Sequence, residues 1–146
     1  MLDILLLEAK EIMHSVTKVS PDTSITAAAK IMDQKLIGSV LVEEGDRIIG
    51  IMTERDILRK IVAKGKNPDE VKVKAVMSYP IITIDANEDI TEASKKIDQH
   101  KIRRLIITEN GKIVGIVTAN SIAKNLRYVL ASRSLHTQKE YTRPEY

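Results

Sequence analysis

The sequence contains two copies of one pattern, and this internal repeat constrains the fold more than any other feature. The stretch Ile48–Thr53 returns as Ile113–Thr118, at an offset of 65 residues. Upstream of these stretches, one extra residue near Pro80 changes the offset, so that Met13 matches Met77. Each copy has about 55 residues, and a segment of that size buries so little apolar surface that it is only marginally stable alone. We therefore expect the two copies to pack on each other as one pseudo-symmetric pair.

Within each copy, the hydrophobic pattern predicts the element order β-α-β-β-α. In the first copy, the apolar run Val16–Val19 is followed by turn residues and by a helix that begins at Ile25. Strands at 39–42 and 47–52 flank a Gly-containing turn, which is typical of a β-hairpin, and a second helix begins at Thr53. The second copy repeats this order. The predicted fold class is therefore α+β, with two β-α-β-β-α repeats related by pseudo-two-fold symmetry.

These patterns divide the chain into five segments. They are an N-terminal helical segment at 1–11, the first repeat at 12–65, a linker at 66–75, the second repeat at 76–130 and a polar tail at 131–146.

The composition argues against several classes of function. The 146 residues include 23 Lys and Arg, 20 Asp and Glu, 3 His and no Cys. The lack of cysteine excludes a disulfide framework, a thiolate metal site and a cysteine nucleophile, and the scattered histidines do not have metal-ligand spacing. The net charge of +3 is too small to indicate strong binding to nucleic acid. We expect no metal, no cofactor and no nucleic-acid partner.

The start of the chain and its apolar runs indicate the compartment. No run approaches the roughly 20 apolar residues that a membrane helix needs. The run Leu2–Leu7 carries Asp3 where a signal peptide has basic residues, and no small-residue cleavage site follows it. We therefore expect a cytoplasmic protein with no membrane partner.

The repeated pattern resembles a tandem pair of cystathionine-β-synthase (CBS) domains, the Bateman module. The residues that carry the resemblance are the two strand-to-helix junctions, Gly50–Thr53 and Gly115–Thr118, together with Val76–Ser78 and the run from Lys101 to Leu105. The resemblance spans residues 12–128. It implies a module that binds adenosine ligands (AMP, ADP, ATP or S-adenosylmethionine) in clefts between the copies. It also implies a homodimer that regulates a partner protein.

Thr53 and Asp56 are the main candidate ligand-binding residues. They open a helix directly after an apolar strand, and the N–H groups and partial positive charge of a helix N-terminus suit a phosphate. In the family that the chain resembles, the Asp of this T-x-x-D pattern binds the ribose hydroxyls and the Thr lies near the phosphate. The alternative is structural, because Thr-x-x-Asp is also close to a helix capping box. One pair of residues can serve both purposes.

The second copy departs from this pattern, because Ser121 stands where the first copy has Asp56. A serine cannot hold a ribose diol with two acceptor oxygens, and hydrogen bonds to a charged acceptor are about twice as strong as neutral ones. The sequence therefore predicts one nucleotide per chain, with a second cleft that is weaker, empty or adapted to another ligand. The residues expected at this second cleft are Thr118, Asn120, Ser121, Ile84 and Ile102.

Basic side chains are needed near a bound phosphate. We expect Arg103 of the second copy to reach the phosphate of the ligand at Asp56. Neighbouring strand residues face opposite sides, so only one of Arg103 and Arg104 faces this cleft, and which one does stays open. Arg55 lies at the mouth of the same helix and either reaches a phosphate or is solvated. The two strand arginines have a structural alternative as solvated charges at a strand edge.

The resemblance also implies an apolar slot for adenine beside Asp56. Its expected residues come from the first strand and from the segment before the second strand, namely Lys18, Val19, Ser20, Ile37, Gly38 and Ser39.

The sequence bears on three other functions. An enzyme is not indicated, because the sequence has no P-loop, no ordered Ser, His and Asp triad and no H-E-x-x-H motif. A structural dimerisation module with a vestigial cleft stays open as an alternative. A nucleic-acid-binding protein is a further alternative, because lysines gather around the linker between Lys60 and Lys74.

Overall fold

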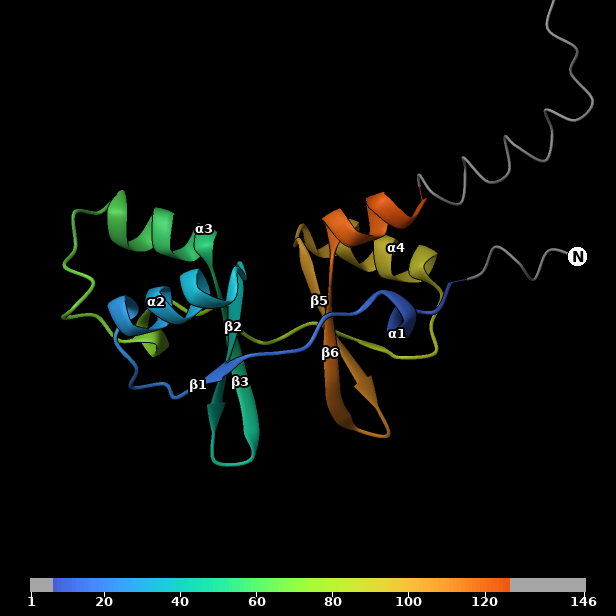
Figure 1. Ribbon diagram of the computed structural model, residues 1–146, viewed down its shortest axis with the longest axis horizontal. Coiled ribbons are helices and arrows are strands. Elements are labelled where there is room, and N and C mark those ends of the chain that lie inside the picture. Colours follow the sequence, from blue (N-terminus) through green and yellow to red (C-terminus); the bar gives the residue numbers. More distant parts are fainter. Residues whose placement is uncertain (1–6, 127–146) are drawn as a thin grey trace, which may run out of the picture. The chain divides into compact units, whose positions relative to one another are not determined.

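The computed structural model describes residues 7–126, which form two compact units (Figure 1). The first-repeat unit is Ser15–Ile82. The second-repeat unit combines Met1–His14 with Thr83–Tyr146. The predicted polar tail at 131–146, the end of the predicted second repeat and the start of the N-terminal segment lie outside the described residues. No helix within residues 7–126 is long and apolar enough to cross a membrane.

The first-repeat unit has the predicted order of elements around a three-stranded sheet. Its elements are β1 (Lys18–Val19), α2 (Ile25–Lys35), β2 (Ser39–Glu44), β3 (Arg47–Thr53), α3 (Glu54–Ile57), a π-helical turn η2 (Leu58–Val62) and a 3₁₀ turn η3 (Val73–Ala75). The strand order is β1-β2-β3, in which β1 is parallel to β2 and β2 is antiparallel to β3.

The second-repeat unit has the same topology. Its elements are α1 (Ala9–Ile12), β4 (Thr83–Asp85), α4 (Ile90–His100), β5 (Arg104–Glu109), β6 (Lys112–Thr118) and a helical segment at 119–126. The strand order is β4-β5-β6, again with one parallel and one antiparallel pair. The predicted α+β fold with two β-α-β-β-α repeats is therefore confirmed.

The corresponding helices α2 and α4 begin and end in the same way. The side chain of Ser24 accepts a hydrogen bond from a backbone N–H in the first turn of α2, and Asp89 does the same for α4. Such caps satisfy N–H groups that have no partner within the helix. Leu36 and Lys101 then end the helices in the left-handed conformation, with φ of 54° and 53°. Local sequence thus sets both ends of each helix.

The core of each unit is aliphatic. In the first-repeat unit, Ile25, Ala28 and Met32 of α2 are buried against the sheet residues Val40 and Met52. This cluster matches the composition, because the chain contains no Phe and no Trp.

Each unit is completed by the short segment that precedes the other repeat. Ser78 pairs with Ile51 of β3, through N–H to oxygen distances of 2.8 and 3.0 Å. His14 pairs with Ile116 of β6 in the same way, at 2.8 and 3.0 Å. The segment before β4 therefore belongs to the first-repeat unit, and the segment before β1 belongs to the second-repeat unit.

The glycine of each strand-to-helix motif makes room for a methionine of these segments. A Cβ atom on Gly50 would lie 2.7 Å from the Sδ atom of Met77 and 3.0 Å from the carbonyl oxygen of Ser78. A Cβ atom on Gly115 would likewise overlap the side chain of Met13. The repeated glycine is thus a packing requirement, because both segments cross directly over it.

Part of the segment predicted as a linker, 66–75, is folded onto the first-repeat unit. Val73 is fully buried, and its N–H donates to the Thr23 carbonyl at 2.8 Å. The Nζ atoms of Lys74 and Lys72 lie 3.1 and 3.3 Å from Asp22 Oδ1. Hydrogen bonds and charge from Lys74 and Lys72 lower the pKa of Asp22 below its ordinary value. Two of the lysines that gather around the linker are therefore paired with an acid.

Candidate functional site

The first strand-to-helix junction is a capping box. Thr53 is the N-cap of α3, and its Oγ1 accepts from the Asp56 N–H at 3.2 Å. Asp56 Oδ2 accepts in return from the Thr53 N–H at 2.9 Å and from Thr53 Oγ1 at 3.2 Å. The structural alternative considered for this pair is therefore present, and the predicted ribose role stays a prediction.

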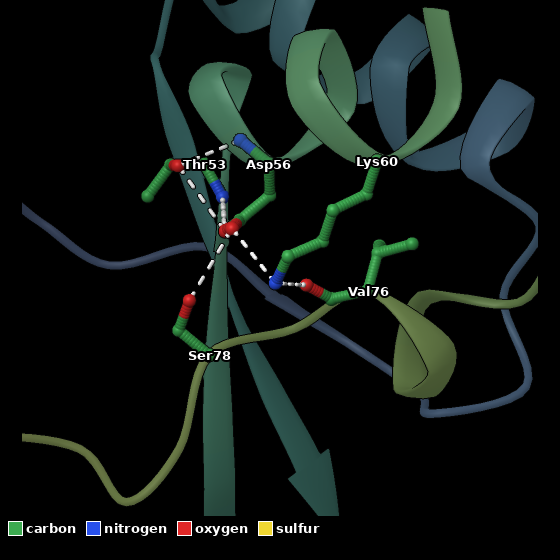
Figure 2. Close-up of polar contacts among 5 residues, drawn as sticks. All are labelled: Thr53, Asp56, Lys60, Val76 and Ser78. Atoms are coloured by element: carbon green, nitrogen blue, oxygen red, sulfur yellow. Dashed lines mark hydrogen bonds and ion pairs between the residues drawn. The ribbon is translucent and has the colours of Figure 1, made fainter. Parts of the chain in front are cut away.

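The other carboxylate oxygen of Asp56 is also occupied (Figure 2). Asp56 Oδ1 accepts from Ser78 Oγ at 3.3 Å and pairs with Lys60 Nζ at 3.2 Å. Lys60 Nζ also donates to the Val76 carbonyl at 2.7 Å. Asp56 is only 8% exposed, and it is the one buried charged residue among residues 7–126. We call Thr53, Asp56, Lys60, Val76 and Ser78 the Asp56 network.

This network limits what Asp56 can bind. A carboxylate has about four acceptor positions, and here each oxygen already has two partners. A ribose diol at Asp56 would therefore have to displace the Ser78 hydroxyl or the Lys60 ammonium. Sequence reasoning did not include these two residues. Lys60 was detectable as an i,i+4 partner of Asp56, whereas Ser78 is distant in sequence and gave no local signal.

The second junction has a similar cap built from neutral groups. Ser121 donates its N–H to Thr118 Oγ1 at 3.0 Å, and Ser121 Oγ accepts from the Thr118 N–H at 3.3 Å. The two hydroxyls also hydrogen-bond to each other. Asn125 Nδ2 donates to the Ser121 carbonyl at 2.7 Å, so its amide binds its own helix.

A pocket of about 440 Å³ lies over this second junction, within the second-repeat unit. Its lining residues come from α1 and the two residues after it, from the end of β6 and from the helical segment that follows: Glu11, Ile12, Met13, His14, Thr118, Asn120, Ser121, Lys124 and Asn125. The volume falls in the range of small-molecule sites. We call this cavity the Ser121 pocket.

Three of the residues predicted for the second cleft, Thr118, Asn120 and Ser121, line the Ser121 pocket. Ile84 is instead a buried core residue of β4, and Ile102 is half-buried directly after α4. Sequence reasoning missed the contributions of His14 and Lys124 to this pocket. His14 is remote in sequence from Ser121 and gave no local signal. Lys124 lies about one helical turn after Ser121, and this spacing could have predicted that both face the same pocket.

The residues predicted around Asp56 take different positions. Ser39 lies opposite Thr53 in the β2–β3 ladder, and the Gly38 carbonyl accepts from the Glu54 N–H at 3.0 Å. The segment 38–39 and the Thr53 junction are therefore neighbours, and the adenine slot predicted there stays a prediction. Arg55 is exposed on α3.

The remaining slot residues belong to the first sheet and its core. Lys18 is exposed and pairs with Glu43 at 3.1 Å, and Ser20 is exposed in the turn after β1. Val19 is buried and Ile37 is half-buried against the same core. The predicted role of these four residues in holding adenine stays a prediction.

Arg103 lies just before β5 and Arg104 is its first residue, and the two side chains differ in exposure. Arg103 is exposed, and its carbonyl accepts from the Ala119 N–H at 2.8 Å. Arg104 is half-buried opposite Thr118 in the β5–β6 ladder. Both belong to the second-repeat unit, so the predicted contact of Arg103 with a ligand at Asp56 stays a prediction.

Comparison with known proteins agrees with the repeat and the topology. The family model for the CBS domain matches twice, at residues 9–63 and 73–128. A protein of Methanopyrus kandleri is 40% identical over 118 residues, which is 80% of this chain and 60% of that protein. This chain thus spans less than two thirds of that relative.

Two solved structures have the same fold. A structure described as a candidate signal-transduction protein with CBS domains, from Burkholderia ambifaria, is 25% identical with a TM-score of 0.76, over 82% of this chain and 93% of that one. A hexameric CBS-CP12 protein from bloom-forming cyanobacteria is 26% identical with a TM-score of 0.77, over 82% of this chain and 67% of that one. With two family-model matches that together cover most of its length, the chain belongs to the CBS-domain family and carries a CBS pair.

Proposed function

We propose that this chain is a regulatory module that binds an adenine nucleotide and signals to a partner protein through its conformation or oligomeric state. The observation that carries the proposal is the Ser121 pocket, which has nucleotide-compatible volume at a strand-to-helix junction of the CBS pair. The ammonium of Lys124 and the imidazole of His14 line this pocket and supply groups that suit a phosphate. The signal-transduction description of the Burkholderia relative supports the regulatory part.

The proposed mechanism is a shift between two conformations. A nucleotide that binds one conformation more tightly raises the population of that conformation, by no more than its difference in affinity allows. A tenfold shift requires a difference of only about 1.4 kcal/mol. The chain itself would carry out no catalysis, so the output depends on a partner.

Self-association is the second part of the proposal. Leu58 and Val62 are 59% and 64% exposed, and they lie one turn apart on the same helical face of the first-repeat unit. An apolar pair of this kind suits a contact between two copies in a homodimer. The hexameric cyanobacterial relative supports self-association within the family. The cytoplasm, where adenine nucleotides are abundant, is the proposed location.

Isothermal titration calorimetry tests nucleotide binding directly. AMP, ADP, ATP and S-adenosylmethionine are titrated separately into the chain, and thermal unfolding is followed with each ligand. We expect saturable heat and a raised unfolding temperature with at least one adenine nucleotide, because a ligand that binds only the folded state stabilises it. No heat and no thermal shift with any ligand would refute the proposal and favour the structural dimerisation module.

A further inference from the structure

The Asp56 network and the Ser121 pocket occupy equivalent positions in the two units. The repeat offset relates the network residues, in order, to residues of the second-repeat unit: Thr53, Asp56, Lys60, Val76 and Ser78 correspond to Thr118, Ser121, Asn125, Ile12 and His14. All five of the corresponding residues line the Ser121 pocket. At equivalent positions, the first-repeat unit thus has the side-chain contacts of the Asp56 network and the second-repeat unit has the Ser121 pocket.

The difference depends on one side chain. In the first-repeat unit, Lys60 extends from the helix across to the segment before the second repeat, where it donates to the Val76 carbonyl at 2.7 Å (Figure 2). On the way it pairs with Asp56 at 3.2 Å. In the second-repeat unit, the shorter Asn125 binds the Ser121 carbonyl of its own helix at 2.7 Å. No bridge from position 125 to the opposite segment is formed among the described residues, and the gap is a pocket.

The charges reinforce this difference. Asp56 is buried, and its hydrogen bonds with Lys60 and Ser78 involve an ionised group, which makes them stronger than neutral bonds. A ligand at this place has to replace a partner of a buried carboxylate. At the Ser121 pocket, the positions that correspond to Asp56 and Lys60 carry the neutral side chains of Ser121 and Asn125, so a ligand there does not have to break an equivalent ion pair.

We propose that Lys60 closes the first site and that nucleotide enters the Ser121 pocket first, because Asn125 in place of a lysine leaves that pocket open. The inference rests on the proposed nucleotide binding. It makes Lys60 and Asn125 the residues that decide which repeat takes the ligand. It also reverses the predicted order of affinity, because the difference between Asp56 and Ser121 alone made the second cleft the weaker one. Asp56 becomes available to a ribose only after Lys60 leaves it.

Exchanging the two residues tests the inference. ATP and AMP are titrated by calorimetry into the wild type, Lys60→Asn and Asn125→Lys, with Lys64→Asn as a control that removes the same charge from an exposed position. In the wild type and in Lys64→Asn we expect one nucleotide per chain. In Lys60→Asn the stoichiometry rises to two. In Asn125→Lys the affinity of the Ser121 pocket falls at least about tenfold, since a bound ligand must now displace the lysine.

Thermal unfolding shows whether each variant is folded. If Asn125→Lys does not fold, His14→Trp is used instead, because it blocks the Ser121 pocket from its opposite wall. If the wild type binds nucleotide and both Asn125→Lys and His14→Trp bind it equally well, the inference is overturned. Weaker binding in Lys60→Asn would overturn it too, because Lys60 would then contact the ligand. If neither nucleotide binds the wild type or any variant, the proposed function itself is refuted.

Discussion

Replacing Asp56 with alanine should destabilise the protein far more than the equivalent change in the second repeat. Asp56 accepts hydrogen bonds from the backbone of Thr53 and from the side chain of Ser78, and it pairs with Lys60. In Asp56→Ala all of these donors lose their acceptor at once. Because Asp56 is 8% exposed, water reaches the vacated position poorly.

The expected cost follows from these contacts. Loss of the acceptor for the Thr53 N–H costs about 1–2 kcal/mol, as for other helix caps. The Ser78 hydroxyl also loses its acceptor, which adds about 0.5–1 kcal/mol. The Lys60 side chain is 45% exposed, so solvent screens its pair, which contributes less than about 1 kcal/mol. The total is about 1.5–4 kcal/mol, which lowers the unfolding temperature of a chain of this length by about 3–16 °C.

Urea unfolding followed by circular dichroism measures this cost, with Ser121→Ala as the matched control. The control loses only neutral hydrogen bonds, those of Ser121 Oγ with the N–H, the hydroxyl and the carbonyl of Thr118, so we expect about 0.5–1 kcal/mol. If Asp56→Ala costs less than about 0.5 kcal/mol, or no more than Ser121→Ala, then the Asp56 network does not stabilise the first-repeat unit as argued.

Further predictions concern packing, pH and nucleic acid. Gly50→Ala places a Cβ atom 2.7 Å from Met77 Sδ and should lower the free energy of unfolding in urea by about 1–3 kcal/mol. The double variant with Met77→Ala should recover part of that loss. If Gly50→Ala is as stable as the wild type, this packing argument is wrong. Asp22→Asn should lower the unfolding temperature slightly at neutral pH. The pKa of Asp22 is lowered in the folded state by Lys74 and Lys72, so its contribution is present above the ordinary value of 3.8 and disappears as the pH falls through the lower folded value. A difference from the wild type that persists in stronger acid would refute this assignment. Random duplex DNA should not bind in about 50 mM salt, whereas binding that weakens steeply with added salt would support the nucleic-acid alternative.

The topology was predictable because its signals are local and occur twice. The cap at Ser24, the hairpin turn and the apolar strands each lie within a few residues of chain, and their recurrence at Asp89 and beyond supports each assignment. The capping box of Thr53 and Asp56 could be read for the same reason.

The exchange of segments between the repeats was not predictable in this way. Met13 and Met77 were recognised as equivalent, but an offset does not tell which sheet each methionine covers. The contacts with Gly115 and Gly50 that answer this question join residues far apart in sequence. The Asp56 network depends on such a contact through Ser78, and so does the Ser121 pocket through its N-terminal wall.

The comparison of Asp56 with Ser121 illustrates the limit of reading one position at a time. A carboxylate is the better ribose ligand in isolation, and this argument favours the first repeat. Position 60 reverses the preference, because Lys60 uses the same carboxylate and Asn125 does not offer an equivalent bridge. The proposed order of nucleotide binding therefore rests on a pair of positions one helical turn apart in each repeat.

Nuclear magnetic resonance tests the central claim most directly, because it reports binding and location together. In a ¹⁵N-labelled sample titrated with ATP, we expect saturable shifts of the backbone amides of His14, Ser121 and Asn125. The amides of Asp56 and Lys60 should stay unchanged over the same range. Shifts confined to Asp56 and Lys60 would contradict the assignment of the ligand to the Ser121 pocket, and no shifts anywhere in the chain would contradict nucleotide binding itself.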